Sequence, residues 1–298
     1  MLASEITRKF CFRDGRGFRL ADIDPADTCG LDLEKDDAKK LLASGVKRLA
    51  KLQERLYAED RWSLLVILQG LDTAGKDGVI EHVMSGVNPM GCEVHSFKAP
   101  SELELDHDFL WRCAVVLPRR GNIGIFNRSY YEEVLVVRVH PKFLDDQWLP
   151  RALREKDLKH LWQSRYEEIN AFEKAMNSQN ICFLKFFLHI SKEEQRKRFL
   201  KRLDDPEKHW KFSAADVRER AHWGDYQEAY EDALNATSTD WAPWHVIPAD
   251  KKWFARACVA DIIASRIAKL DLRYPTLSDK DRAALAEARR ELESEMDG

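Results

Sequence analysis

The chain has 298 residues, of which 44% are hydrophobic and 33% are charged, and its formal net charge is -3. This balance excludes a disordered chain, and the length suffices for one large α/β domain with a full core. A slightly acidic protein does not gather polyanions by its overall field, so we expect no nucleic-acid partner. Any phosphate-rich ligand must instead meet a local basic patch.

The sequence carries no export or membrane signal. The first 18 residues lack an apolar signal core, and the longest apolar stretch, 64–68, is far too short to span a bilayer. No two of the six cysteines form a C-x-x-C pair, and Cys92, Cys182 and Cys258 lie in apolar runs, as reduced core thiols do. We therefore expect a cytoplasmic protein with no disulfide framework and no membrane association.

In chain order, apolar runs alternate with segments of helical period. Residues 1–30 show no steady period and are expected to form an arm or a loop. The alternation that follows predicts an α/β fold with a parallel sheet covered by helices on both faces, and a helix-prone tail from Ser278. The expected strands are 63–68, 93–97, 122–127, 181–190 and 244–247. The expected helices are 36–57, 79–87, 102–116, 129–139, 157–176, 192–203, 214–234 and 251–272.

A glycine-bearing turn follows the first strand directly. Residues 70–78 fit G-x-x-x-x-G-K, the pattern of a phosphate-binding loop. Gly70 and Gly75 let successive backbone N–H groups face one concavity, and the following helix points its positive dipole end at the same place. Lys76 adds a positive charge for a phosphate. A glycine turn that merely joins a strand to a helix is the alternative interpretation.

Two carboxylates accompany this loop. Asp77 stands where Ser or Thr is usual, and Asp72 lies inside the turn. Carboxylates can hold Mg²⁺ directly or through water, so both are candidate metal ligands between two phosphate chains. For Asp72 the alternative is an Asx-turn that stabilises the loop.

A second strand ends at Asn127, followed by Arg128 and Ser129. In open α/β sheets, ligands bind at the carboxyl ends of the strands. Arg128 can clamp phosphate oxygens with two parallel N–H bonds, and Ser129 is placed to cap the next helix. An ordinary surface ion pair is the alternative role for Arg128.

The segment 192–211 is strongly basic. Five cations and no acid fall within residues 196–202, and Arg198 and Arg202 are four residues apart on one face. Asp205 and Pro206 then break the helix, and a loop with Trp210 and Lys211 follows. A cationic helix that ends in a loop is typical of a lid over an anion, although a solvated charged face would give the same pattern.

These parts suit phosphoryl transfer between two phosphate compounds. Such a reaction needs positioning and neutralisation of charge. A nucleotide's terminal phosphate is largely ionised at neutral pH, with a pKa of roughly 6 to 7, so cations and Mg²⁺ matter more than a base. Lys76, Arg128 and the cations of 196–202 would supply the positive charge.

Five separated motifs together resemble the polyphosphate kinase 2 family over roughly residues 35 to 272. They are 69–78 (QGLDTAGKDG), 85–89 (SGVNP), 97–100 (FKAP), 126–131 (FNRSYY), and Asp205-Pro206 with Trp210-Lys211. The resemblance implies a P-loop NTPase-like, thymidylate-kinase-like fold with a helical lid. It also implies reversible transfer from inorganic polyphosphate to adenine nucleotides, possible use of guanine nucleotides, a need for Mg²⁺, and a homo-oligomer.

Carried onto this chain, the resemblance divides it into an arm (1–34), a kinase domain (35–272) with a lid at about 192–213, and a helical tail (273–298). Asp72, Lys76 and Arg128 would be catalytic, and Asp72 and Asp77 would bind metal. The expected phosphate- and nucleotide-binding residues are Gly70, Thr73, Ala74, Gly75, Lys76, Asp77, Gly78, Asn127, Ser129, Glu132 and Glu133. The expected polyphosphate and lid residues are Lys98, Arg198, Arg202, Trp210 and Lys211.

The identity of the acceptor is the finer question. Many relatives that act on nucleoside diphosphates carry Asp-Arg-Ser in the second motif, whereas this chain has Asn127 there and then Glu132 and Glu133. This variant resembles the subgroup that phosphorylates both mono- and diphosphates. An ATP-dependent nucleoside monophosphate kinase, or a non-catalytic polyphosphate- or nucleotide-binding protein, remains the alternative function.

Overall fold

The computed structural model describes residues 8–15, 17–150, 153, 157–211 and 213–295. Parts of three predicted segments lie outside these residues, namely 1–7 and 16 of the arm, 212 of the lid and 296–298 of the tail.

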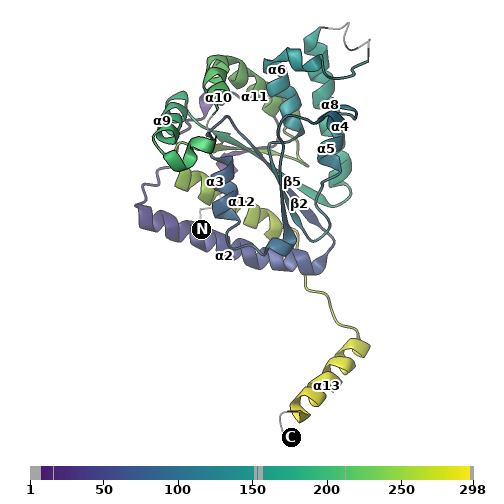
Figure 1. The fold of residues 1–298 in the computed structure, drawn as a ribbon. Coiled ribbons are helices and arrows are strands. Elements are labelled where there is room, and N and C mark those ends of the chain that lie inside the picture. Colours follow the sequence, from purple (N-terminus) through teal and green to yellow (C-terminus); the bar gives the residue numbers. More distant parts are fainter. Residues whose placement is uncertain (1–7, 16, 151–152, 154–156, 212, 296–298) are drawn as a thin grey trace.

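A sheet forms the centre of the molecule (Figure 1). It has six strands, in the order β1-β6-β5-β2-β4-β3. Strands β2 to β6 are parallel to one another, which confirms the predicted α/β fold. The strands are β1 (Cys11–Phe12), β2 (Ser63–Gln69), β3 (Cys92–Ser96), β4 (Ile123–Asn127), β5 (Ile181–His189) and β6 (Trp244–Pro248).

One edge of the sheet differs from the prediction. The segment expected to be a loop or arm contributes β1, which pairs antiparallel with β6, so the sheet is mixed. The amide of Val246 donates to the carbonyl of Phe10 (2.9 Å), and the Phe10 side chain is buried with its ring edge-on to Phe254. Burial of this ring and pairing of the backbone at the edge of β6 explain why a segment without periodicity is ordered here.

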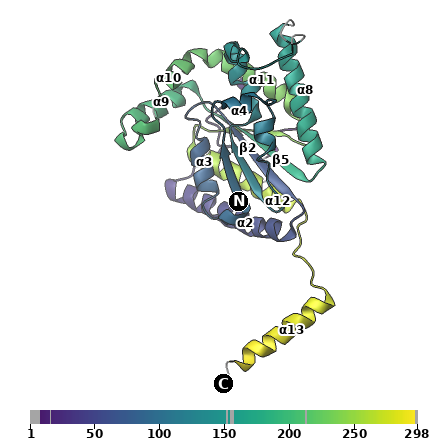
Figure 2. The ribbon, with the colours of Figure 1, turned by 45° about the vertical axis from the view of Figure 1, so that its right-hand side comes forward.

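Helices cover both faces of the sheet (Figures 1 and 2). The α-helices are α2 (Lys35–Glu59), α3 (Lys76–Val83), α4 (Glu102–Leu105), α5 (Trp111–Ala114), α6 (Val136–Val139), α8 (Leu158–Asn177), α9 (Lys192–Leu203), α10 (Ala214–Glu219), α11 (Trp223–Thr237), α12 (Lys252–Ala268) and α13 (Asp279–Ser294). The 3-10 helices are η1 (Leu20–Asp22), η2 (Pro89–Gly91), η3 (Tyr130–Val134), η4 (Pro141–Leu144), η5 (Pro206–Lys211) and η6 (Arg220–His222).

Strand β2 shows how the two layers are built. All seven of its residues are buried, and its side chains alternate between two hydrophobic clusters. Leu64 and Val66 pack in the cluster with α2, α3 and α12, whereas Leu65 and Ile67 pack in the cluster with α8 and α11. A continuous apolar run is therefore required here, because neither face of the strand meets water.

Three predicted helices are interrupted. The expected helix 102–116 is two short helices, because the Asp108 carboxylate accepts from the amide of Leu110 (3.0 Å) and stabilises a turn between them. The expected helix 129–139 begins as η3, where the hydroxyls of Tyr130 and Tyr131 both donate to Glu173 (2.8 Å). The expected helix 214–234 is α10, η6 and α11. Tertiary contacts override helical periodicity at these places.

The carboxylate of Glu173 lies at the centre of a buried polar network behind the sheet. Lys185 of β5 donates to Glu173 (2.7 Å), to the hydroxyl of Tyr131 (2.8 Å) and to the carbonyl of Thr237 (2.8 Å). Both charged side chains are fully buried, and burial lowers the pKa of Lys185. The pair fixes α8 to β5 by hydrogen bonds that have no competing water.

Three further features concern the cysteine thiols, the apolar character of the helices and the position of α13. All six cysteines are among the described residues and are free thiols there; Cys182 and Cys258 are buried, whereas Cys92 is only partly so. In the described part of the chain, no helix combines the length and apolar character that a membrane span requires. Helix α13 lies apart from the rest of the molecule in both views (Figures 1 and 2).

Candidate active site

The predicted phosphate loop joins the end of β2 to the start of α3. Gly70 (φ 155°) and Gly75 (φ 109°) have backbone angles that L side chains rarely adopt, and Thr73 is also left-handed (φ 63°). A Cβ on Gly70 would stand 2.9 Å from the Cβ of Ala74 and 3.0 Å from the carbonyl oxygen of Leu188. Gly70 therefore has no room for a side chain, and both glycines supply backbone angles that this loop needs.

Lys76 is the first residue of α3 and points back into this loop. Its ammonium donates to the carbonyl of Gly70 (2.6 Å) and more weakly to that of Leu71 (3.4 Å). The side chain is buried, and burial, assisted by the charge of Arg128 and opposed by Asp72, lowers its pKa to about 8. A phosphate bound in the loop would stabilise the charged ammonium, since it supplies the counter-charge that burial withholds.

Arg128 follows the end of β4, beside the phosphate loop. The parallel register places Asn127 opposite Leu68, and the amide of Arg128 donates to the Leu68 carbonyl (3.0 Å). The guanidinium lies between two carboxylates, donating to Asp72 (2.9 Å) and to Glu132 (3.2 Å). The charges of Glu132 and Asp72 raise its pKa. Arg128 has φ 64°, so its backbone is strained at the place where two strand ends meet.

Asp77 and Asn127 contact each other where the start of α3 meets the end of β4. The amide nitrogen of Asn127 donates to Asp77 (2.9 Å), while its oxygen is buried and has no hydrogen-bond partner among the described residues. Carboxylate and amide oxygens are the ligands that Mg²⁺ takes, and this ion needs just one or two carboxylates when phosphates and waters complete its shell. No cluster of three metal-binding side chains occurs among the described residues. The donor set therefore fits Mg²⁺ bound together with phosphate.

Arg198 does not project from the lid as an open cation, which corrects the expected geometry of α9. It is 8% exposed, and its guanidinium donates to the carbonyls of Thr73 (2.9 Å), Ala74 (2.8 Å) and Ala249 (2.5 Å). Its Nε donates to Glu194 (2.7 Å). Arg198 thus forms hydrogen bonds with backbone carbonyls on the outer side of the phosphate loop, and these bonds stabilise the conformation of the loop.

The other predicted lid residues lie at different depths. Arg202 lines the cleft and faces Asp216 at 3.7 Å, and Lys98 also lines the cleft. Trp210 is 78% exposed on η5, a 3-10 helix where a loop was expected, and Lys211 is its last residue. On the outer face of α9, Arg196 pairs with Glu193 (2.8 Å). Helix α9 thus combines a solvated face with a face toward the cleft.

A cleft of about 740 Å³ joins these groups at the carboxyl ends of β2 and β4. Its described lining has nine cationic side chains against three carboxylates. The cations are Lys76, Lys98, Arg128, Arg198, Lys201, Arg202, Lys208, Lys252 and Arg256, and the acids are Asp72, Asp77 and Glu81. The charge of such a surface is complementary to an extended polyanion, although the net charge of the whole chain is slightly negative.

Sequence reasoning gave no role to Lys208, Lys252 or Arg256. Lys252 and Arg256 share a face of α12, and α12 follows β6. The position of Lys252 and Arg256 at the cleft could have been predicted, because the carboxyl ends of parallel strands lie at the same edge of a sheet. Strand β6 lies beside β5 and ends on the same side of the sheet as β2.

Four predicted phosphate- and nucleotide-binding residues are absent from the described lining of the cleft, namely Gly70, Ser129, Glu132 and Glu133, and two of these have buried side chains. Ser129 is fully buried, and its hydroxyl accepts from the amide of Tyr131 (3.2 Å), as expected of a capping residue. Glu133 is buried against Arg165, whose guanidinium donates to it at 2.8 Å. Neither side chain lines the cleft, because Ser129 is enclosed beside Gln69 of β2 and Glu133 packs against Arg165 of α8. Of the two predicted glutamates, Glu132 and Glu133, only Glu132 lies at the site, where it contacts Arg128.

A second, smaller hollow of about 40 Å³ lies on the other side of the Asp72–Arg128 pair. Both residues line it together with Glu132 and the aromatic side chains of α11, Trp223, Tyr226 and Tyr230. The ion pair thus separates a large cationic cleft from a small hollow of acidic and aromatic character.

Comparison with known proteins agrees with this geometry. The family model described as polyphosphate kinase 2 matches residues 32–274. A protein of Rhodopseudomonas palustris named ADP-polyphosphate phosphotransferase is 50% identical over 258 residues, covering 87% of this chain and 89% of that protein. A protein of Meiothermus ruber named AMP/ADP-polyphosphate phosphotransferase is 47% identical over 270 residues, covering 90% of this chain and 96% of that protein.

A solved structure has the same fold. The crystal structure of polyphosphate kinase 2 from Arthrobacter aurescens superposes with a TM-score of 0.82 at 44% sequence identity, over 93% of this chain and 95% of that one. The match spans the sheet, the phosphate loop and the helical layers described above. From the extent of the family match and these identities, the chain belongs to the polyphosphate kinase 2 family.

Proposed function

We propose that this chain is an enzyme that transfers phosphoryl groups reversibly between inorganic polyphosphate and adenine nucleotides, giving ADP from AMP and ATP from ADP. The observation that carries the proposal is the cleft, where nine cations surround a phosphate loop at the carboxyl end of the sheet. A mononucleotide needs fewer cations than this, whereas a polyphosphate chain has about one negative charge on each phosphate. The names of the two relatives support the same reaction class.

In this reaction, a terminal phosphate oxygen of the nucleotide attacks the end phosphorus of polyphosphate. A new P–O bond forms, and the bond from that phosphorus to the chain breaks, so the chain leaves one phosphate shorter with its electron pair on oxygen. Lys76 and the amides of the phosphate loop hold the transferring group, and Arg128 neutralises charge beside it. The nucleotide phosphate is already ionised, so the site needs no general base.

Mg²⁺ completes the site in this proposal. Asp77 and Asp72, with phosphate oxygens and waters, would hold the ion, and the unpaired oxygen of Asn127 is a further ligand or water acceptor. When bound, the ion supplies positive charge that offsets repulsion between donor and acceptor. Asp72 also positions Arg128 through their ion pair.

Donor and acceptor would approach from the two sides of the Asp72–Arg128 pair. The cationic cleft suits polyphosphate, with Lys98 and Arg202 on its walls and Trp210 and Lys211 on the lid. The small hollow, of about 40 Å³, does not enclose a nucleoside, so the nucleoside would lie at its mouth, where acidic and aromatic side chains can contact a base and ribose hydroxyls. We assign AMP and ADP as acceptors, since Asn127 and Glu132 occupy the variant positions of the second motif. Use of guanine nucleotides stays a prediction.

The cellular compartment of the reaction is also part of the proposal. We assign the reaction to the cytoplasm, which six free thiols favour. The division into an arm, a kinase domain and a tail stays a prediction from the sequence.

The decisive experiment is an incubation of purified protein with Mg²⁺ and long-chain polyphosphate, with AMP or ADP added separately, followed by nucleotide chromatography. We expect ADP and ATP from AMP, and ATP from ADP. A parallel incubation with ATP and AMP but without polyphosphate is the control. Full-rate ADP formation in that control would identify an ATP-dependent monophosphate kinase. Binding of polyphosphate without turnover would identify a non-catalytic binding protein.

A further inference from the structure

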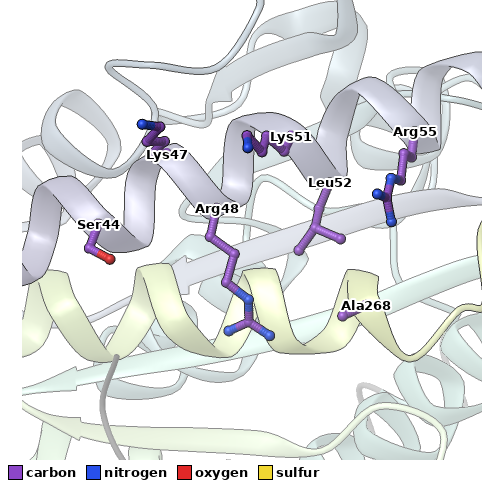
Figure 3. A pocket seen from close by; sticks show the side chains of 7 residues that line it. All are labelled: Ser44, Lys47, Arg48, Lys51, Leu52, Arg55 and Ala268. Carbon is purple, nitrogen blue, oxygen red and sulfur yellow. The ribbon is translucent and has the colours of Figure 1, made fainter.

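A second cationic groove, of about 360 Å³, lies between α2 and the last turn of α12 (Figure 3). It shares no described lining residue with the catalytic cleft, which contacts the first turns of α12 instead. Its lining is Ser44, Lys47, Arg48, Lys51, Leu52, Arg55 and Ala268. The groove is therefore distinct from the cleft in which we place phosphoryl transfer.

The groove has a charged rim and an apolar floor. Lys47, Lys51 and Arg55 are exposed, and none has an ion pair with a described carboxylate. Arg48 and Leu52 extend from α2 toward α12 (Figure 3), where Arg48 pairs with Asp261 at 3.3 Å and Leu52 packs against the core. The rim therefore offers three uncompensated positive charges in one row, spaced about 6 Å apart by the four-residue pitch.

Helix α13 is the complementary element. Every described residue of α13 is exposed, including Leu285 (57%) and Leu292 (63%). A helix of 16 residues with no packing partner is marginal in water, because most helical stability comes from burial of an apolar face. Its leucines and its capping box at Ser278 are typical of a helix that packs on another surface.

The two helices match position by position. Counted from Ser44, six groove residues of α2 lie at positions 0, 3, 4, 7, 8 and 11. The matching residues of α13 lie at the same positions counted from Ala284. The α2 set is Ser44, Lys47, Arg48, Lys51, Leu52 and Arg55, and the α13 set is Ala284, Glu287, Ala288, Glu291, Leu292 and Glu295. Three cations on one helix thus correspond to three carboxylates on the other, with a leucine beside each row.

The acidic row is available for pairing. Glu287, Glu291 and Glu295 have no ion pair with a described residue, whereas Glu293 on another face pairs with Arg289 at 2.7 Å. Glu295 follows the last residue of α13 but keeps helical angles (φ −67°, ψ −22°), so it continues the row. Because both rows have the same pitch, the charges meet whether the helices pack parallel or antiparallel.

We infer that α13 of one copy of this chain docks into the α2–α12 groove of a second copy, in a reciprocal exchange. The connection leaves α12 beside its own groove and carries α13 away from the body in both views (Figures 1 and 2). Residues 269–278 can span at most about 33 Å, enough to reach an adjacent molecule. In a dimer with two-fold symmetry, each copy would place its α13 in the groove of the other, so the same contact occurs twice and covers both helices and both grooves.

A cross-linking experiment tests the exchange on the full chain. Lys51 and Glu291 are the central members of the two rows, so they oppose each other in either helix direction. We expect Lys51→Cys and an affinity-tagged Glu291→Cys, mixed and mildly oxidised, to give a disulfide-linked heterodimer on a non-reducing gel. The unsubstituted chain, with its six native thiols, and each single variant alone are the controls. In the double variant Lys51→Cys/Glu291→Cys, a cross-link within one chain would overturn the inference in favour of self-docking.

Charge reversal supplies the second test. We expect Lys47→Glu/Lys51→Glu/Arg55→Glu to weaken dimerisation at least tenfold by sedimentation, and Glu287→Lys/Glu291→Lys/Glu295→Lys to do the same. The combined six-fold variant should regain wild-type association. The matched control, Lys35→Glu/Lys39→Glu/Lys40→Glu, changes the same charge on the exposed start of α2 and should dimerise normally. An unchanged association constant in both reversed variants, or weaker polyphosphate retention with no change in assembly, would overturn the inference.

Discussion

The guanidinium of Arg128 donates to the carboxylate of Asp72 across 2.9 Å, and this contact forms the wall between the large cleft and the small hollow. It joins the phosphate loop after β2 to the end of β4. Arg128 also bonds Glu132, so its charge is already shared by two carboxylates before a ligand arrives. A phosphate that enters the site must compete with these partners, which makes the pair sensitive to the loss of either acid.

We predict that Asp72→Asn lowers kcat at least ~100-fold and that added Mg²⁺ restores it only in part. The amide keeps the shape of the carboxylate but loses the charge that orients Arg128 and the metal. Steady-state kinetics over a range of Mg²⁺ concentrations provide the measurement. Glu132→Gln is the matched control, since it removes the other carboxylate partner of Arg128 and should cost less. Full activity in Asp72→Asn would leave this residue as a turn former.

For Lys76 we predict a loss of at least ~100-fold in kcat on substitution by Ala, with an unchanged melting curve, because its charge acts on the transferring group. We also predict a pH dependence. The pKa of Lys76 is lowered to about 8, so the ammonium is charged below this pH and neutral above it. The kcat/KM for polyphosphate should therefore fall as pH rises through about 8. The Lys76→Arg profile should stay flat to pH 10, and a flat wild-type profile would contradict the assignment.

The two arginines of α9 should behave differently. Arg198→Ala leaves the carbonyls of Thr73, Ala74 and Ala249 without their donor, so we expect a stability loss of at least ~2 kcal/mol and weaker binding of both substrates. Arg202→Ala should leave the melting temperature unchanged, raise the KM for long polyphosphate several-fold and flatten its salt dependence. Thermal melts and kinetics at two ionic strengths separate these outcomes. Equal effects of both variants would mean that Arg198 also touches the donor.

The buried Lys185–Glu173 pair predicts a purely structural effect. Glu173→Gln should lower the free energy of unfolding by about 3 to 5 kcal/mol, because it leaves a buried ammonium without its counter-charge. Replacing both residues, as in Lys185→Met/Glu173→Leu, removes the buried charges but leaves the hydroxyls of Tyr130 and Tyr131 without their acceptor, so it should recover only part of this loss. Chemical denaturation gives the measurement, and kcat of the folded fraction should stay near wild type. A loss below ~1 kcal/mol in Glu173→Gln would show that water reaches the pair.

The phosphate loop and the end of β4 could be predicted from the sequence, because both depend on local signals. An apolar run, a glycine turn and a polar tip specify Lys76, Asp72 and Arg128 within a few residues. The direction of Arg198 could not be predicted, since a four-residue spacing tells which residues share a face but not what that face meets. The burial of Glu133 could not be predicted either, because it depends on a contact with Arg165, which is 32 residues away in the sequence.

The pairing of β1 with β6 also bears on how this protein is made. Cys11 and Phe12 leave the ribosome early, yet their partners, His245 and Trp244, emerge more than 200 residues later. The sheet therefore cannot close its edge during most of synthesis, and the first segment must wait for the last strand. Until β6 emerges, β5 forms the open edge of the sheet and presents unpaired backbone groups to any passing strand, so nascent chains of this protein are most exposed to aggregation before β6 is synthesised.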